Sequence, residues 1–169
     1  MVSQAVHEDR GAFRPRRAAS LRGFSLLEVI MVMVVGLILT AVAVPFLQSA
    51  MGTYRLRSAV SSITAAVQSA RYQAIFQGYP FRVAFSSANN NYQVSSQPAG
   101  APGFAALGGP IPFGSTQVTL AGDFTLQFNP SGSVVVVAGP NPMTTTVGYM
   151  GRQPKTIRVS TNGNVSVTP

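Results

Sequence analysis

Three patterns of hydrophobic and polar positions follow one another along the chain, and the first is an apolar segment near the N-terminus. Residues 29–47 contain no charged side chain, and on a helix their apolar side chains would lie on all sides rather than along one stripe. Such a pattern is typical of a helix that is buried in lipid or among other helices. Its nineteen residues, at about 1.5 Å each, nearly cross a hydrocarbon core of roughly 30 Å. We therefore predict a membrane-spanning helix over residues 24–50.

The second pattern is amphipathic. Beyond Pro45 the polarity rises but helical spacing persists, which predicts an amphipathic helix over residues 51–78 whose apolar stripe packs on a sheet. Pro45 is expected to kink the helix, and Gly52 is a second weak point. Gly78 suits the left-handed conformation that ends a helix. The stripe recurs at alternating steps of four and three residues: Leu56, Val60, Ile63, Val67, Ala70 and Ala74.

The third pattern begins at Pro80, where the hydrophobic period becomes two. Short runs rich in β-branched and aromatic residues alternate with turn residues, which is typical of antiparallel strands. The pair Asn162-Gly163, between the last two runs, is a strong hairpin signal. Residues 97–114 are rich in Gly, Pro and Ala and predict a long loop, either functional or mobile. The predicted strands are residues 81–85, 92–95, 117–120, 125–128, 133–138, 144–149, 156–160 and 164–168.

This order of elements predicts an α+β fold. A long N-terminal helix, with a membrane-spanning first half and an amphipathic second half, packs on an antiparallel β-sheet domain of residues 79–169. The residues beyond the membrane segment are enough for one small domain.

One carboxylate, Glu28, lies at the start of the apolar helix. Because a lone carboxylate is costly there, it should reach the interface or meet a positive partner. A cut between Gly23 and Phe24 would create such a partner. The new α-amino group of Phe24 would lie at the positive end of the helix dipole, four residues from Glu28 on the same face. This pair could close within one chain or between neighbouring chains of a bundle.

Residues 22–28, RGFSLLE, resemble the cleavage and methylation motif of prepilins, the precursors of type IV pilin-like proteins. The resemblance extends to the apolar helix that follows, with Pro45 near its end. It implies that a membrane prepilin peptidase cuts after Gly23 and removes residues 1–23 as a leader. It also implies that the amine of Phe24 is methylated, and that Glu28 helps to recruit the subunit into a helical filament.

Two other readings of the N-terminus stay open. An ordinary secretory signal could be cleaved after Ala41-Val42-Ala43, which would release a soluble domain that starts at Val44. The second of these readings is an uncleaved membrane anchor in which the Glu28 side chain reaches the interface. In every case the five arginines before the apolar run predict a cytoplasmic N-terminus and an exported C-terminal part.

Two segments of the strand region carry a second resemblance. Residues 124–134, FTLQFNPSGSV, and residues 157–167, IRVSTNGNVSV, resemble the minor pseudopilins of the GspH/FimT type. The resemblance implies a pilin-like fold and a structural subunit of the type II secretion pseudopilus. Such a subunit sits in the bacterial inner membrane with its domain in the periplasm, and it assembles with other pseudopilins. The alternative is a minor type IV pilin that takes part in pilus assembly or DNA uptake.

DNA binding in some FimT-like proteins is attributed to a C-terminal Gly-Arg-x-Arg turn. The equivalent hairpin here reads Asn-Gly-Asn-Val-Ser over residues 162–166 and lacks the arginines. Arg152, Lys155 and Arg158 place three cations within seven residues nearby. Three charges predict only a weak, salt-sensitive nucleic-acid contact, and a solvated rim is the favoured interpretation.

Composition argues against an enzyme. The chain carries a formal charge of +8 and no cysteine. The exported part contains no histidine and a single carboxylate, Asp123, which follows Gly122 and is typical of a turn. An acid–base pair, a catalytic triad or a carboxylate cage for calcium cannot be assembled from these side chains. We therefore expect a structural protein with no catalytic residue, no metal site and no cofactor.

Overall fold

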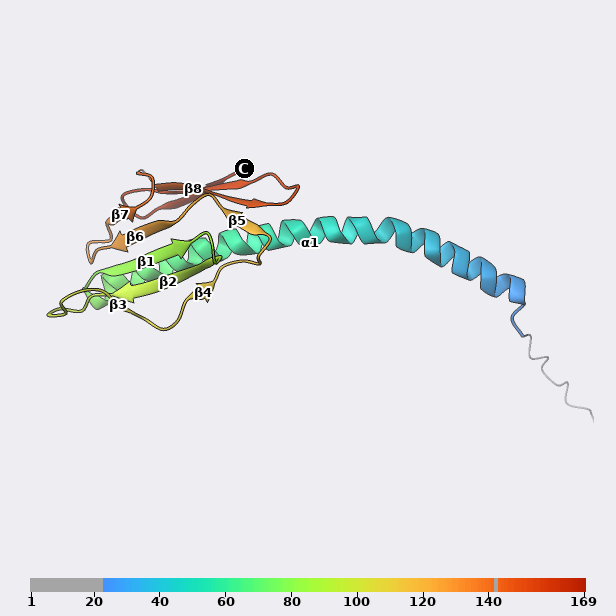
Figure 1. Cartoon of the computed structure of the whole chain (residues 1–169), viewed down its shortest axis with the longest axis horizontal. Helices are drawn as coiled ribbons and strands as arrows, with labels where there is room; N and C mark the ends of the chain where they lie inside the picture. The colour runs from blue at the N-terminus through green and yellow to red at the C-terminus, as the bar shows by residue number, and fades with distance from the viewer. Residues whose placement is uncertain (1–22, 142) are drawn as a thin grey trace, which may run out of the picture. The chain divides into compact units, whose positions relative to one another are not determined.

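The computed structural model describes residues 23–141 and 143–169. The leader predicted for residues 1–23 lies outside the described residues, apart from Gly23. The described part of the chain consists of one helix, α1, and ten strands (Figure 1). Residues 42–169 form one compact unit, and the described residues up to Ala41 belong to another.

Helix α1 runs from Leu26 to Gln77, so the two helical patterns of the sequence form one element of 52 residues. Pro45 lies inside this helix, and the kink expected there stays a prediction. The helix ends as the sequence predicted. The N–H of Gly78 donates to the carbonyl of Ala74 at 3.1 Å, and Gly78 has a φ of 75°, which glycine adopts without strain.

The second half of α1 packs its apolar stripe into the core. All six residues of the predicted stripe are buried, together with Ala59 and Ala66. This confirms that residues 56–74 present one face to the sheets. Small side chains such as Ala59, Ala66, Ala70 and Ala74 let strands approach the helix closely, which favours dense packing.

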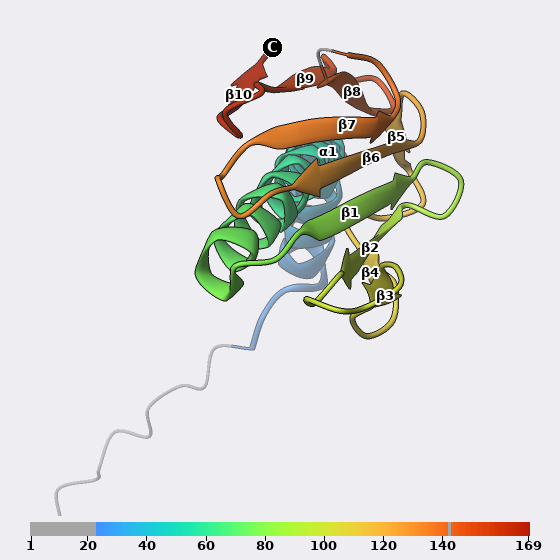
Figure 2. The ribbon, with the colours of Figure 1, turned by 90° about the vertical axis from the view of Figure 1, so that its left-hand side faces the viewer.

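The strands form two antiparallel sheets that share one hydrophobic core with α1. The first has the order β3-β2-β1-β6-β7, with β4 also paired to β2, and the second has the order β10-β9-β8-β5. Figure 2 shows β1, β6 and β7 crossing over α1. Each of the eight predicted runs overlaps a strand. The strands are β1 (Phe81–Ser86), β2 (Asn91–Ser96), β3 (Ala105–Ala106), β4 (Ile111–Pro112), β5 (Val118–Leu120), β6 (Phe124–Phe128), β7 (Val134–Ala138), β8 (Met143–Tyr149), β9 (Lys155–Val159) and β10 (Val165–Thr168).

The segment 97–114 is fastened to the first sheet. Its two short strands, β3 and β4, pair with β2. The N–H of Leu107 donates to the carbonyl of Val94 at 2.8 Å, and the buried ring of Phe113 joins the core. Arg82 on β1 lies 3.9 Å from the centre of the Phe104 ring, a cation–π contact. The segment is therefore a lateral extension of the sheet.

The neighbouring strands β1 and β6 of the first sheet contribute buried side chains to the core. Alternate residues of both strands are buried, as the period of two predicts. The antiparallel register sets Phe85 opposite Phe124, and their rings stack with centroids 4.4 Å apart. At the other end of the same strand pair, Phe81 lies opposite Phe128, and both are fully buried.

Arg71 of α1 joins the two sheets at one end. Its Nε donates to the carbonyl of Gly132, in the turn between β6 and β7, at 3.3 Å. Its side chain also lies over Gly163, in the predicted hairpin turn between β9 and β10. Gly163 is buried and has a φ of 75°. A Cβ added there would lie only 2.6 Å from Cδ of Arg71. Position 163 therefore requires glycine, because its backbone is left-handed and because Arg71 leaves no room for a Cβ.

Gly163→Ala is expected to lower the free energy of unfolding by about 2 kcal/mol, because the left-handed conformation and the contact with Arg71 both oppose a Cβ. The measurement is urea unfolding of parent and variant in mild detergent. Arg71→Ala in the Gly163→Ala background should recover the part that is due to the contact. If the two substitutions are simply additive, Arg71 does not restrict position 163.

Asp123 lies in the bend between β5 and β6, where the sequence predicted a turn residue. Its Oδ1 accepts hydrogen bonds from the hydroxyl and the N–H of Ser87, each at 2.7 Å. The side-chain hydrogen bond and then the backbone hydrogen bond lower the pKa of Asp123 below its ordinary value. The carboxylate thereby ties the end of β1 to the start of β6.

Because the pKa of Asp123 is lowered in the folded state, the domain should lose stability as the pH falls into the acid range. The contribution of Asp123 is fully present above the ordinary aspartate pKa of about 3.9 and is lost as the pH falls through the lowered pKa of the folded state. Asp123→Asn should therefore reduce the fall in Tm between pH 5 and pH 3. The check is a pair of thermal unfolding series. An identical acid dependence in parent and variant would exclude a role for this carboxylate.

Candidate functional site

The start of α1 holds the residues of the prepilin motif. Phe24 is 82% exposed, and the helix begins two residues later at Leu26. Ser25 caps it: its carbonyl accepts from the N–H groups of Glu28 and Val29, and its Oγ accepts from the N–H of Leu27 at 3.3 Å. Sequence reasoning missed this role, although the spacing of Ser25 and Glu28 is that of a capping box.

Within the described part of the chain, the apolar half of α1 keeps its large side chains exposed. Its most apolar window has a mean hydropathy of 2.7, and none of it is buried. By length and composition this helix could cross a membrane. Glu28 lies beside Leu27, Met31, Val32 and Val35 along a shallow surface hollow of about 440 Å³. The arrangement offers an apolar surface with one carboxylate near its end. In the uncut chain the nitrogen of Phe24 belongs to a peptide bond, so the pairing with Glu28 stays a prediction.

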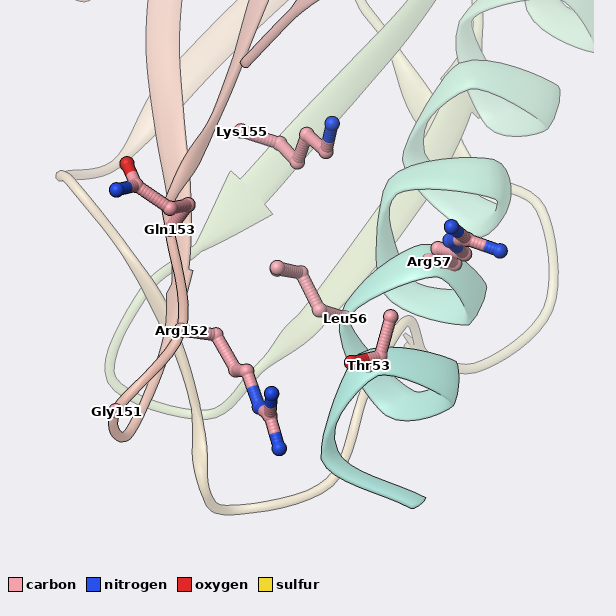
Figure 3. A pocket seen from close by; sticks show the side chains of 7 residues that line it. All are labelled: Thr53, Leu56, Arg57, Gly151, Arg152, Gln153 and Lys155. Carbon is pink, nitrogen blue, oxygen red and sulfur yellow. The ribbon is translucent and has the colours of Figure 1, made fainter. Parts of the chain in front are cut away.

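A second candidate site is a groove between α1 and the second sheet (Figure 3). Thr53, Leu56 and Arg57 line it from the helix, and Gly151, Arg152, Gln153 and Lys155 line it from the β8–β9 side. Its volume is about 330 Å³. A neighbouring hollow of about 490 Å³ shares Arg57 and Lys155 and continues along Val60, Ser61, Thr64, Ala65 and Val167. No acidic residue lines either hollow.

Arg152, which lines this groove, links the β8–β9 turn to α1. Its Nη2 donates to the carbonyl of Ser49 at 2.7 Å and to the Ser49 hydroxyl at 2.6 Å. Gly52 is buried beneath the turn, where an added Cβ would lie 3.0 Å from the ring of Tyr149 and 3.4 Å from Nε of Arg152. The glycine that sequence reasoning treated as a weak point of the helix is therefore a close-packing position.

Arg55 forms a second polar link between α1 and this sheet. Its Nη1 donates to Oε1 of Gln117 at 2.6 Å and to the hydroxyl of Tyr149 at 3.3 Å, and that hydroxyl donates to Gln117 at 2.7 Å. Arg55 and Arg152 are thus engaged in packing the helix against the sheet. Within residues 23–141 and 143–169, the side chains of Arg57 and Lys155, the other cations of the groove, form no hydrogen bond with protein.

The three cations predicted as a weak nucleic-acid contact do not share one surface. Lys155 and the buried Ile157 point to the helix side of β9, whereas the exposed Arg158 points to the opposite side. Arg152 and Lys155 line the same groove as Arg57, which sequence reasoning missed because it lies almost 100 residues earlier. Among residues 23–141 and 143–169 there is no cluster of three or more His, Cys, Asp or Glu side chains that could hold a metal.

Comparison with known proteins decides the family. The family model described as "Type II transport protein GspH" matches residues 59–163. The chain belongs to the GspH family. This match extends from the buried half of α1 to the β9–β10 turn, and it confirms the resemblance that residues 124–134 and 157–167 carried. GspH-family proteins are pseudopilins, structural proteins of type II secretion without enzymatic activity.

The fold of this GspH-family chain is that of a minor pilin. The crystal structure of the type IV minor pilin FimU of Pseudomonas aeruginosa PAO1, in space group P21, matches with a TM-score of 0.52 and 19% identity. The match covers 69% of this chain and 90% of FimU. A second crystal form of FimU gives a TM-score of 0.47, with 19% identity over 68% of this chain and 93% of FimU. No curated protein sequence matches the chain.

Proposed function

We propose that this GspH-family protein is a minor pseudopilin that is processed after Gly23 and assembled into the pseudopilus of the type II secretion system, where it supports protein export. Residues 1–23 are the leader, residues 24–50 the membrane and filament-core helix, residues 51–78 the amphipathic helix and residues 79–169 the periplasmic domain. The observation that carries the proposal is a GspH-family domain joined to an apolar helix whose side chains are unburied.

The proposed mechanism is assembly rather than catalysis. The apolar helix first anchors the subunit in the inner membrane, and the prepilin peptidase then frees the amine of Phe24. Extraction into the filament transfers the exposed apolar side chains from lipid to the helices of other pseudopilins. Pairing of Glu28 with the Phe24 amine sets the register, because an unpaired carboxylate is costly among apolar helices.

The proposal is tested by the mass and N-terminal residue of the full-length protein in the membrane fraction, expressed with and without a prepilin peptidase. We expect a start at a methylated Phe24 only with the peptidase. Gly23→Val is a suitable control, because among the described residues, apart from its chain neighbour, no heavy atom lies within 4 Å of the position where its Cβ would be placed. This variant should keep its leader and an intact domain. A start at Val44 in a soluble fraction would contradict the proposal and support an ordinary secretory signal.

A second candidate is a FimT-like minor type IV pilin that binds DNA. The cations Arg152, Lys155 and Arg57 around one groove favour it, whereas the divided placement of Lys155 and Arg158 weighs against a continuous phosphate track. Titration with duplex DNA at two salt concentrations separates the candidates. The pseudopilin role predicts no binding, whereas a DNA-uptake role predicts binding that falls steeply with salt.

A further inference from the structure

The β8–β9 turn lies beside the point where the apolar stretch of α1 ends. The charge-free run ends at Leu47, and Arg152 of the turn is hydrogen-bonded to Ser49, two residues further on. Gly52 lets Tyr149 pack against the next turn of the helix. If the charge-free residues 29–47 lie in the hydrocarbon core, the hydrogen bonds of Arg152 fix the turn at the level of the lipid headgroups.

The exposed side chains at this level are those of a membrane interface. Met150, at the tip of the turn, is 82% exposed, more than any other large apolar side chain of residues 42–169. On the helix, Met51 and Tyr54 are also exposed. Tyrosine favours the headgroup region because its ring is apolar and its hydroxyl is polar. Each of these three side chains is at least 49% exposed.

The charges beside the turn favour an anionic surface. Arg57 and Lys155 face the groove, and no acidic residue lines it. Arg57 lies ten residues beyond Leu47, or about 15 Å along a helix. The headgroup layer adds roughly 5–8 Å beyond the hydrocarbon core, so the long side chain of Arg57 reaches its outer edge. Basic residues close to an anionic membrane are each attracted to it.

We propose that the β8–β9 turn docks on anionic phospholipid, with Met150 at the boundary between headgroups and acyl chains and with Arg57 and Lys155 at the outer edge of the anionic headgroup layer. The inference rests on the membrane anchoring that the proposed function includes. It accounts for the exposed Met150, which a nucleic-acid site leaves unexplained. Docking holds the domain of an unassembled subunit on the membrane, and incorporation into a filament must release it.

The chain contains neither cysteine nor tryptophan, so a single introduced cysteine can be labelled without background. Met150→Cys, carrying an environment-sensitive dye, is placed in the full-length protein in nanodiscs. With about one third phosphatidylglycerol, we expect a blue-shifted emission that spin-labelled lipids quench. Phosphatidylcholine alone or high salt should weaken both effects. Asn162→Cys is the matched control, because the exposed β9–β10 turn lies at the opposite end of β9.

The charge requirement is tested in the labelled protein with Arg57→Gln and Lys155→Gln. Each change should lower the ratio of docked to undocked domain about fivefold, and the two together about 25-fold. Arg158→Gln, on the opposite side of β9, should leave the ratio unchanged.

Three outcomes would overturn the inference. The first is a dye at position 150 that stays as water-exposed as one at position 162 in anionic nanodiscs. The second is docking that free inorganic phosphate at low millimolar concentration abolishes, which would indicate a site for the ion alone. The third is binding of duplex DNA that depends on Arg57 and Lys155 without any response to lipid. Retention of the protein in the nanodisc reports anchoring separately, so a failure of docking is distinguishable from a failure of the proposed function.

Discussion

Phe124→Ala is expected to lower the free energy of unfolding of the domain by about 3–5 kcal/mol. Phe124 is 1% exposed and lies at the centre of the core, where its ring stacks on that of Phe85. Truncation removes its buried apolar surface, leaves a cavity in the core on the buried face of β1 and β6, and abolishes an aromatic pair that adds about 0.5–1.5 kcal/mol. Because the whole domain is stabilised by roughly 5–15 kcal/mol, this loss leaves it marginal.

The measurement is urea unfolding of the full-length protein in mild detergent, followed by the near-ultraviolet circular dichroism of the tyrosines. Val137→Ala is the control, because Val137 lies on the edge strand β7 and is 46% exposed. It should change stability by no more than about 0.5 kcal/mol. A loss below about 1 kcal/mol for Phe124→Ala would contradict the placement of this ring at the centre of the core.

The elements that the sequence predicted correctly are those with a local signal. The helical stripe from Leu56 to Ala74 and the alternation of β1 and β6 repeat every few residues, so they are visible in short windows. The turn at Gly163 and the helix end at Gly78 depend on the backbone freedom of a single residue type. The cap at Ser25 carries an equally local signal in its spacing from Glu28, and sequence reasoning overlooked it.

The elements that the sequence could not supply depend on distant pairings. The division of the strands into two sheets follows from β5 pairing with β8 and β6 pairing with β1. The strands β3 and β4 have two residues each, too few to show a period. The groove requires Arg152 to meet Ser49, 103 residues away, and no local pattern encodes such a contact.

One feature of the basic site was within reach of the sequence. Lys155 and Arg158 are three residues apart on a strand, and side chains at odd separations point to opposite faces. The predicted strand 156–160 began one residue after Lys155, and a strand extended by that one residue would have placed the two cations on opposite faces. Sequence reasoning grouped Lys155 with Arg158, which the pleat of β9 places on opposite faces. In the structure, Lys155 instead lines a groove together with Arg152 and with Arg57 of α1.

Glu28→Leu is expected to leave membrane insertion and leader removal intact but to lower incorporation into the filament at least about tenfold. Glu28 is exposed on α1 and accepts no hydrogen bond from a neighbouring side chain in the described part of the chain, so leucine should not disturb the helix. In the proposed filament, however, leucine would leave the amine of Phe24 without a carboxylate among apolar helices. Removal of one partner from a buried pair costs about 3–5 kcal/mol, far more than tenfold in an equilibrium.

The measurement is the fraction of subunit recovered with sheared filaments, with the mass of the membrane form recorded in parallel. If the membrane form of the variant begins at Phe24, the leader has been removed, and any loss from the filament is a defect of assembly. Met31→Leu, a substitution on the same exposed stretch that preserves apolar volume, should assemble like the parent. If Glu28→Leu also assembles and supports secretion like the parent, the filament does not depend on pairing of this carboxylate. The exposed apolar surface of α1 alone would then be sufficient to drive assembly.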